Sequence, residues 1–297
     1  MPSRSRPRRR RGPGPGELFV RFLLFAAVAL AALVAWAWLR VATIDVAGLA
    51  TRDPGPTALM RQREHEARAA GKPWHPVRRW VAYERISPHL RRAVLIAEDD
   101  AFFSHDGLDW NEIKHSARKD LASRRIVRGG STITQQLAKN LWLSTSRSPL
   151  RKFEEVLLAF RLERALGKKR IFELYLNVIE WGDGVFGADA AARRWFHTSA
   201  SSLDARQSVR LAAVIINPRR YSPVEPPRRI ERRVRIIAGR MRRRGELSEA
   251  DWRAVLGLPA ADPAPVPPVD TSGANGEGGA GDGSGVPATA DTSAAAH

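Results

Sequence analysis

Three consecutive acids lie beside two phenylalanines in the segment AEDDAFFSHDG. A carboxylate can act as a general base when partial burial raises its pKa toward neutrality, and Phe102 and Phe103 could provide that burial. In the alternative interpretation, the segment is a helix end that frays into a turn, with Glu98, Asp99 and Asp100 in water. Taken alone, the segment favours the solvated turn, and it does not decide which acid would react.

Two glycines precede a run of polar side chains in RGGSTITQQLAKN, residues 128–140. The free N–H groups and the positive dipole end of a helix that begins here would bind an anion. The phosphate-binding pattern G-x-x-x-x-G-K-S/T is absent, so a nucleoside triphosphate has no support. A glycine turn before a capped helix explains the segment equally well. However, a solvated helix face more often carries Glu/Lys pairs than the polar residues found here, which are Gln135, Gln136, Lys139 and Asn140.

A third cluster places Arg147, Arg151 and Lys152 before two acids, Glu154 and Glu155. A buried carboxylate needs a partner, and a cation one helical turn before Glu155 could provide it. Helical spacing does not decide between the two glutamates, and an ordinary surface ion-pair cluster remains an alternative.

The helices that must position these groups have recognisable start signals. Each begins at a Ser or Thr N-cap that is followed by proline or by a capping-box glutamine: Ser87-Pro88, Thr132 with Gln135, and Ser148-Pro149. The first helix carries Glu98 near its C-terminal end, and the third is expected to end at Gly167. Clear runs that alternate with period two are absent, so we expect a mainly α fold.

The start of the chain predicts a membrane anchor. Six arginines occupy residues 4–11, and residues 22–39 form a run of 18 residues without a charge. At 1.5 Å per residue this run is about 27 Å long, close to the hydrocarbon thickness of a bilayer. A cleaved signal peptide is the alternative, but the Ala-Trp-Ala site at 35–37 lies inside a run that is long for such a peptide. The arginines predict a cytoplasmic N-terminus.

Arginine dominates the charge of the chain, which has 49 Lys and Arg residues, only seven of them Lys, and a formal net charge of +18. This excess favours anionic partners: nucleic acid, anionic lipid or a phosphorylated substrate. Nine arginines at 228–244 could bind nucleic acid. A domain behind a membrane anchor would not meet any, so we interpret them as a membrane-facing or solvated helix. Cysteine is absent, and the histidines show no metal-ligand spacing.

Composition divides the chain into four parts. We expect a disordered basic cytoplasmic tail at 1–16, a transmembrane helix at 17–42 and one globular domain at 43–258. Residues 259–297 are rich in Pro, Gly and Ala and lack aromatic residues, so they are expected to be disordered.

Five short segments occur in order along the chain: E-D-x-x-F-x-x-H-x-G at 98–107, G-G-S-T-I-T-Q-Q at 129–136, R-K-x-x-E at 151–155, I-F-E-L-Y-L-N at 171–177 and N-P-R-R-Y-S-P at 217–223. Taken together, they resemble the five motifs of the peptidoglycan glycosyltransferase family, which includes monofunctional biosynthetic transglycosylases and the N-terminal half of class A penicillin-binding proteins. The resemblance covers about residues 43–245 and selects Glu155 over Glu154. Phe172 stands where the family usually has Leu, and Trp195 stands where the family has an aromatic residue, often Tyr. No transpeptidase motifs follow, so the monofunctional form is expected.

The resemblance implies a lysozyme-like domain with a small membrane-proximal lobe and a substrate, lipid II, that is polymerised into β-1,4 glycan by inversion with release of undecaprenyl diphosphate. Glu98 would be the general base, and Glu155, the second catalytic residue, would orient the neighbouring cations or hold a metal ion. Asp99 and His105 would also brace Glu98, and Asp100 would face water. Substrate binding is expected from Asp99, His105, Ser131, Thr132, Gln135, Gln136, Lys139, Asn140, Arg147, Arg151 and Lys152.

The resemblance also implies the surroundings of the enzyme: the bacterial inner membrane, crossed once, with the domain in the periplasm. The expected partners are lipid II, the growing glycan strand and other cell-wall synthesis proteins, but no nucleic acid. The sequence requires no cofactor and leaves a divalent cation, Mg²⁺ or Mn²⁺, as an open question, with Glu155 as the residue that could hold it. The alternative functions are a glycan-cleaving lytic transglycosylase or muramidase, and a non-catalytic scaffold of the cell-wall machinery.

Overall fold

The computed structural model describes residues 14–110, 112–116, 130–143, 145 and 148–260. All of them belong to one compact unit, Met1–Ala261. Arg147 lies outside the described residues, as do nearly all of the two terminal segments for which disorder was predicted.

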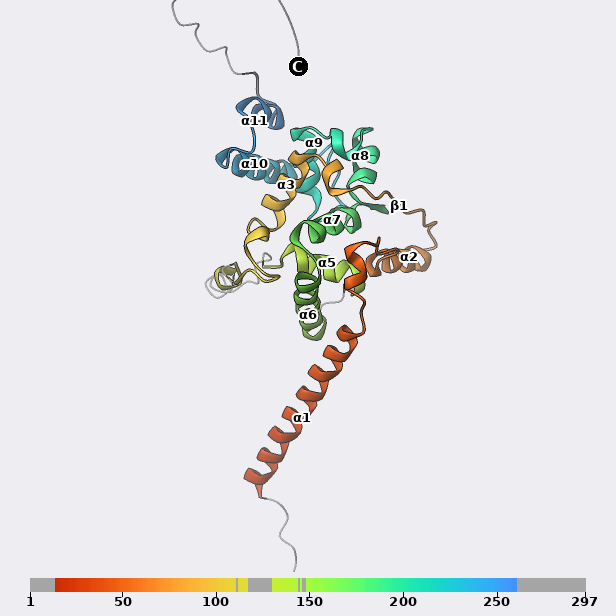
Figure 1. Cartoon of the computed structure of the whole chain (residues 1–297), viewed down its shortest axis with the longest axis vertical. Coiled ribbons are helices and arrows are strands. Elements are labelled where there is room, and N and C mark those ends of the chain that lie inside the picture. Colours follow the sequence, from red (N-terminus) through yellow and green to blue (C-terminus); the bar gives the residue numbers. More distant parts are fainter. Residues whose placement is uncertain (1–13, 111, 117–129, 144, 146–147, 261–297) are drawn as a thin grey trace, which may run out of the picture. The chain divides into compact units, whose positions relative to one another are not determined.

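Helices account for most of the regular structure in the described residues, as Figure 1 shows, so the mainly α prediction is confirmed. The α-helices are α1 (Pro15–Ala42), α2 (Ala58–Ala69), α3 (Pro88–Glu98), α5 (Ile133–Trp142), α6 (Pro149–Ala165), α7 (Lys168–Val178), α8 (Ala188–Phe196), α9 (Ala205–Val214), α10 (Arg228–Arg243) and α11 (Glu249–Leu256).

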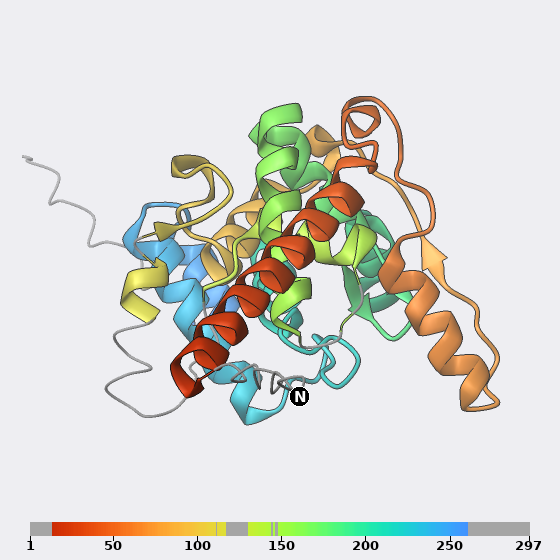
Figure 2. The same ribbon diagram turned by 90° about the horizontal axis from the view of Figure 1, so that it is seen from below.

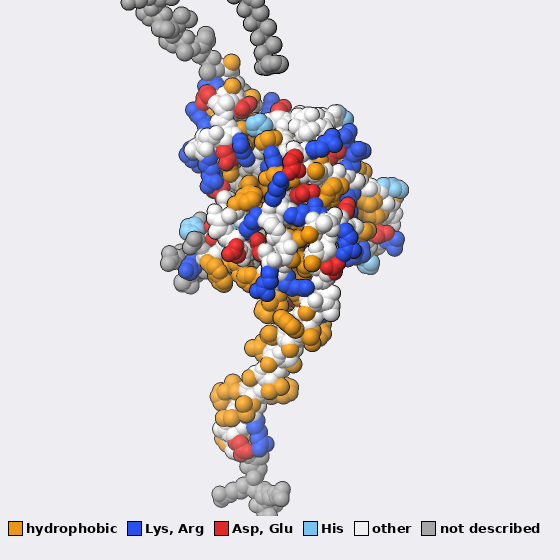
Figure 3. All heavy atoms as spheres, in the orientation of Figure 1, with side chains coloured by type: hydrophobic (Ala, Val, Ile, Leu, Met, Phe, Trp, Pro, Cys, Tyr) orange, Lys and Arg blue, Asp and Glu red, His pale blue; other side chains and the backbone are white. Residues whose placement is uncertain are grey.

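Helix α1 is long and apolar enough to cross a membrane, and it contains an 18-residue stretch with a mean hydropathy of 2.6. In Figure 3 hydrophobic side chains run along most of this helix, whereas charges of both signs are scattered over the visible face of the other helices. Its C-terminal end packs on α6, as the views in Figure 1 and Figure 2 agree. There Arg40 of α1 pairs with Glu154 at 3.2 Å, and Arg161 of α6 donates to the carbonyl oxygen of Ile44 at 2.9 Å. The structure therefore contains the candidate transmembrane helix that was predicted.

Helix α7 lies in the hydrophobic core, because its side chains at 171, 172, 174–176 and 178 are all apolar and fully buried. A helix that is apolar around most of its circumference is stable only when other elements cover it. Phe172 packs on Phe102 with ring centroids 5.7 Å apart. The phenylalanine that replaces the family's usual leucine thus extends an aromatic cluster next to the end of α3.

Helices α3 and α6 end close to their expected positions, but the end of α6 differs in its conformation. Helix α3 ends at Glu98, which was expected near its C-terminal end. Gly167 is not a left-handed end of α6, because its φ is −72° and it serves as the N-cap of α7. Leu166 turns the chain in an extended conformation, which requires no glycine.

A small sheet orders the strands β1 (Val77–Arg78), β3 (Val185–Phe186) and β2 (Glu180–Gly182). Strands β1 and β3 pair in parallel, and β2 and β3 form an antiparallel hairpin. Its turn contains Asp183 and Gly184, and Gly184 has a φ of +71°, a left-handed conformation that favours glycine. Strands of two or three residues are too short to show the alternation on which strand prediction depends.

Candidate active site

Glu98 is held in a polar setting at the end of α3, with only 12% of its side chain exposed. Arg233 of α10 donates to Glu98 Oε1 at 2.8 Å, and Gln136 of α5 donates to Oε2 at 3.2 Å. Burial raises the pKa of Glu98 above its ordinary value, while Arg233, Gln136 and Lys139 oppose the rise. The carboxylate is therefore a better proton acceptor than a solvated glutamate, as a general base requires.

The amide of Gln136 is oriented from behind by a buried tyrosine. The hydroxyl of Tyr175, on α7, donates to Gln136 Oε1 at 3.1 Å, which leaves the amide NH₂ group to donate to Glu98. Burial raises the pKa of Tyr175 well above its ordinary value, so this hydroxyl keeps its proton at any physiological pH. Gln136 is thus positioned to hold Glu98, and its contact with substrate remains a prediction.

Asp99 ties the end of α3 to the start of α5. Its Oδ2 accepts the backbone N–H of Ile133 at 2.8 Å, and its Oδ1 lies 3.0 Å from His105 Nε2. Burial raises the pKa of Asp99. Asp100 is exposed and pairs with Arg244 at 2.6 Å. The three acids therefore have different environments: Glu98 is available for chemistry, Asp99 is a brace, and Asp100 lies at the surface.

Glu155 accepts hydrogen bonds from two cationic side chains. Arg151 Nη1 and Lys152 Nζ each lie 2.5 Å from one of its carboxylate oxygens, and the side chain is 4% exposed. Lys152 also donates to the hydroxyl of Ser131 at 2.9 Å. Glu154 is equally buried but faces the end of α1. Glu155 rather than Glu154 therefore pairs with Arg151 and Lys152, and its catalytic role remains a prediction.

Lys139 connects the two acidic centres electrostatically. Burial lowers the pKa of its ammonium group, Glu155 and Glu98 raise it, and Arg151 and Lys152 lower it further. Lys139 therefore interacts electrostatically with both Glu98 and the cluster around Glu155. Helices α3, α5 and α6 thus bring together a candidate base and a group of cations.

Thr132, Gln135 and Asn140 are buried rather than open to solvent. The hydroxyl of Thr132 accepts the backbone N–H of Gln135, and Gln135 Oε1 accepts the backbone N–H of Thr132, which completes the predicted capping box. Thr132 also donates to the carbonyl oxygen of Gly107 at 2.7 Å. Both capping side chains are therefore occupied in starting α5, and their binding to substrate remains a prediction.

Sequence reasoning missed Arg233, because the arginines of α10 were interpreted as a solvated or membrane-facing set. Its guanidinium donates to Glu98 and also to the carbonyl oxygen of Ala97 at 3.1 Å. A signal was present: Arg233 falls three residues after Ile230 and directly before Val234, within the helix's apolar stripe. An arginine at such a position faces the protein and needs an acid there.

The family model described as "Transglycosylase" matches residues 66–242. The chain belongs to the transglycosylase family. Proteins named biosynthetic peptidoglycan transglycosylase are similar to it. That of Methylobacillus flagellatus is 57% identical over 163 residues, which cover 55% of this chain and 71% of the relative. That of Laribacter hongkongensis is 44% identical over 224 residues, which cover 75% of this chain and 92% of the relative. That of Bordetella pertussis is 48% identical over 197 residues, which cover 65% of this chain and 81% of the relative.

The two centres described above lie within the part of the chain that matches the transglycosylase family. Glu98, Lys139, Glu155 and Arg233 all fall within the matched residues. The chain is a peptidoglycan transglycosylase, and its lysozyme-like fold class agrees with the helical architecture.

Among the described residues of this transglycosylase there is no group of three His, Asp or Glu side chains that could bind a metal ion. Glu155, the acid next to the cationic cluster, already accepts both Arg151 and Lys152. A divalent cation shared with a substrate phosphate needs only one or two protein carboxylates, so this finding leaves the metal question open, and no step below depends on a metal.

Replacing Arg233 with methionine in the transglycosylase is expected to shift the acid limb of the pH–rate profile to higher pH. The arginine lowers the pKa of Glu98, so its loss raises that pKa, and more of the base is protonated at a given pH. The profile of kcat/KM against pH measures the shift. Arg235→Met is the control, because Arg235 is exposed on the same helix. Equal acid limbs in the two variants would refute the tuning role.

Replacing Thr132 with alanine is expected to lower the free energy of unfolding by about 1 kcal/mol, because an N-cap is lost. The midpoint of thermal unfolding should fall by about 2–4 °C. The Thr132→Ser variant keeps the hydroxyl, so its midpoint of thermal unfolding should equal that of the wild type. An alanine variant as stable as the wild type would show that the capping box contributes nothing to the stability of this transglycosylase.

Proposed function

We propose that the enzyme polymerises lipid II into β-1,4 glycan strands. The 4-hydroxyl oxygen of the acceptor's GlcNAc attacks C1 of the donor's MurNAc at the reducing end of the growing strand. A C1–O4 bond forms as the bond between C1 and the diphosphate oxygen breaks, so the α configuration of the donor becomes β. Undecaprenyl diphosphate leaves, and Glu98 takes the hydroxyl proton.

The support for Glu98 as the base is its burial between two hydrogen-bond donors. A glutamate with a raised pKa accepts a proton more readily than one in water, and a well-placed general base contributes about 10²- to 10⁴-fold in rate. Arg233 and Gln136 fix the carboxylate oxygens, so the base is positioned before the acceptor binds. This setting is the observation on which the proposed mechanism chiefly depends.

The support for departure of a diphosphate is the cationic cluster around Glu155. Negative charge develops on the leaving group, and prearranged cations in a partly buried site stabilise it more than water does. Lys139 and Arg151 are the cations that we assign to this task among the described residues. Glu155 would act by orienting Arg151 and Lys152, since it accepts a hydrogen bond from each. No protein-held cofactor is needed for these steps, and assays with EDTA, Mg²⁺ or Mn²⁺ test that proposal.

The apolar helix α1 supports the proposal of a lipid-linked substrate. A domain anchored by such a helix remains at the membrane surface, where lipid II resides. We place the N-terminal arginines in the cytoplasm and the domain in the periplasm, following the usual distribution of positive charge. Other cell-wall synthesis proteins of the inner membrane are the proposed partners.

Parallel assays of two substrates test the proposed function. The purified full-length protein should convert lipid II into polymer and should release no muropeptides from preformed sacculi. Release of muropeptides without polymer formation would instead identify a glycan-cleaving enzyme, and inactivity on both would identify a scaffold.

A further inference from the structure

A cavity of about 240 Å³ opens between the β2–β3 turn, the end of α8 and the loop of the fifth motif. None of its lining residues belongs to the Glu98 or Glu155 centres. The residues that line it include three arginines, one acid and two aromatic rings: Asp183, Arg194, Trp195, Arg219, Arg220 and Tyr221.

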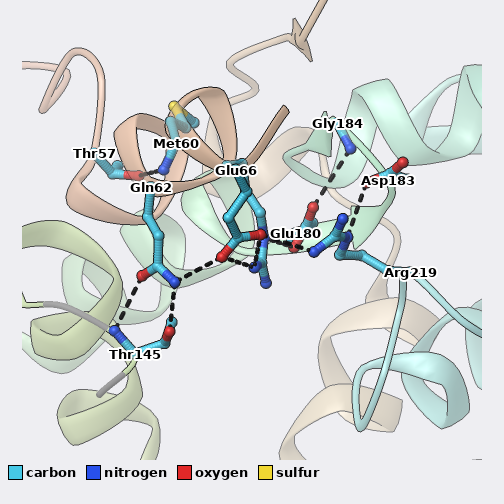
Figure 4. A network of polar contacts seen from close by, with 10 residues as sticks. Thr57, Met60, Gln62, Glu66, Thr145, Glu180, Asp183, Gly184 and Arg219 are labelled. Carbon is cyan, nitrogen blue, oxygen red and sulfur yellow. Dashed lines mark hydrogen bonds and ion pairs between the residues drawn. The ribbon is translucent and has the colours of Figure 1, made fainter. Parts of the chain in front are cut away.

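The three arginines of the cavity differ in how their charge is balanced. Arg219 is neutralised, because it pairs with Asp183 at 2.9 Å and with Glu66 of α2 at 3.0 Å (Figure 4). Arg194 and Arg220 have no acidic partner in the described part of the chain. Each lies instead over the ring of the residue that follows it, at 5.4 and 5.7 Å. Two positive charges therefore remain for a ligand.

The aromatic wall of the cavity is held rigidly. Trp195 Nε1 donates to the carbonyl oxygen of Trp181 at 3.2 Å. Its ring lies so close to Gly182 that a Cβ there would come within 2.8 Å of it. The indole consequently needs little ordering when a ligand arrives, and preorganisation of this kind favours binding.

We propose that this cavity binds a carboxylate-bearing unit of a peptidoglycan strand, an inference that rests on the proposed function. Arginine forks recognise carboxylates, and flat aromatic rings pack against the apolar faces of sugar rings. The cavity is smaller than the roughly 300–1,000 Å³ of pockets for drug-sized ligands, so it accommodates one sugar ring or short acidic group. The carboxylate is either the lactyl group of a muramic sugar or the end of a stem peptide.

Direct binding to the full-length protein tests the proposal with three soluble probes: uncrosslinked peptidoglycan strands with stem peptides, the same strands after removal of the peptides, and neutral chitin oligosaccharides. The double variant Arg194→Ala/Arg220→Ala should bind an acidic strand about tenfold more weakly than the wild type. An effect confined to the first probe identifies the peptide carboxylate, and an effect on the second identifies the lactyl carboxylate.

The matched control is Arg229→Ala/Arg235→Ala, which removes the same charge from exposed positions of α10. Equal losses in the two double variants would overturn the proposal, as would equally tight binding of neutral chitin oligosaccharides. A protein that binds acidic strands through these arginines but makes no polymer would refute the proposed function and leave the cavity assignment standing.

Discussion

Replacing Glu98 with glutamine is expected to lower kcat for lipid II polymerisation by about 10²- to 10⁴-fold, with KM nearly unchanged. Glutamine keeps the size of the side chain and an oxygen that can accept from Arg233, but it cannot take a proton from the acceptor hydroxyl. The initial rate at saturating lipid II measures the effect. Thermal unfolding of both proteins establishes that the variant is folded.

Asp100→Asn is the matched control, since it neutralises a neighbouring acid that lies at the surface and pairs with Arg244. Its rate should remain within about threefold of the wild type, because surface ion pairs contribute little. Near wild-type activity in the Glu98 variant, or an equal loss in the Asp100 variant, would refute the assignment of the base.

Replacing Lys139 with methionine is expected to lower kcat by about 10²- to 10³-fold, because a cation that stabilises the departing diphosphate is lost. Methionine fills a similar volume without the charge. The loss also removes a charge that lowers the pKa of Glu98, so the acid limb of the pH–rate profile should move to higher pH. Single-turnover rates across a pH series measure both effects.

Lys169→Met is the control for this change, because Lys169 pairs with Glu84 at the surface and should be dispensable. Lys139→Arg keeps the charge but alters its geometry, so its rate should lie between those of the wild type and the methionine variant. A methionine variant that retains the wild-type rate would remove Lys139 from the mechanism.

The helices that position the site could be predicted because their start signals are local. The Thr132 capping box and the Ser148 N-cap involve residues three positions apart, and both are confirmed. The pairing of Glu155 with cations one turn earlier is equally local. Such contacts depend on the helix alone, so a sequence pattern is enough to reveal them.

The contacts that set the chemistry of Glu98 could not be predicted in this way. Arg233 is separated from it by 135 residues, and only the packing of α10 against α3 brings the two together. Two residues of the same type can also have different roles that a motif does not distinguish. Gln135 and Gln136 are neighbours in one motif, yet the first caps α5 and the second holds Glu98.

The most direct test of the mechanism is the stoichiometry and stereochemistry of the product formed from labelled lipid II. One undecaprenyl diphosphate should be released for each new glycosidic bond, and a muramidase specific for β-1,4 links should degrade the polymer completely. Release of the diphosphate without polymer, or a polymer with α-links, would contradict inverting transfer to the 4-hydroxyl of an acceptor sugar with Glu98 as its base.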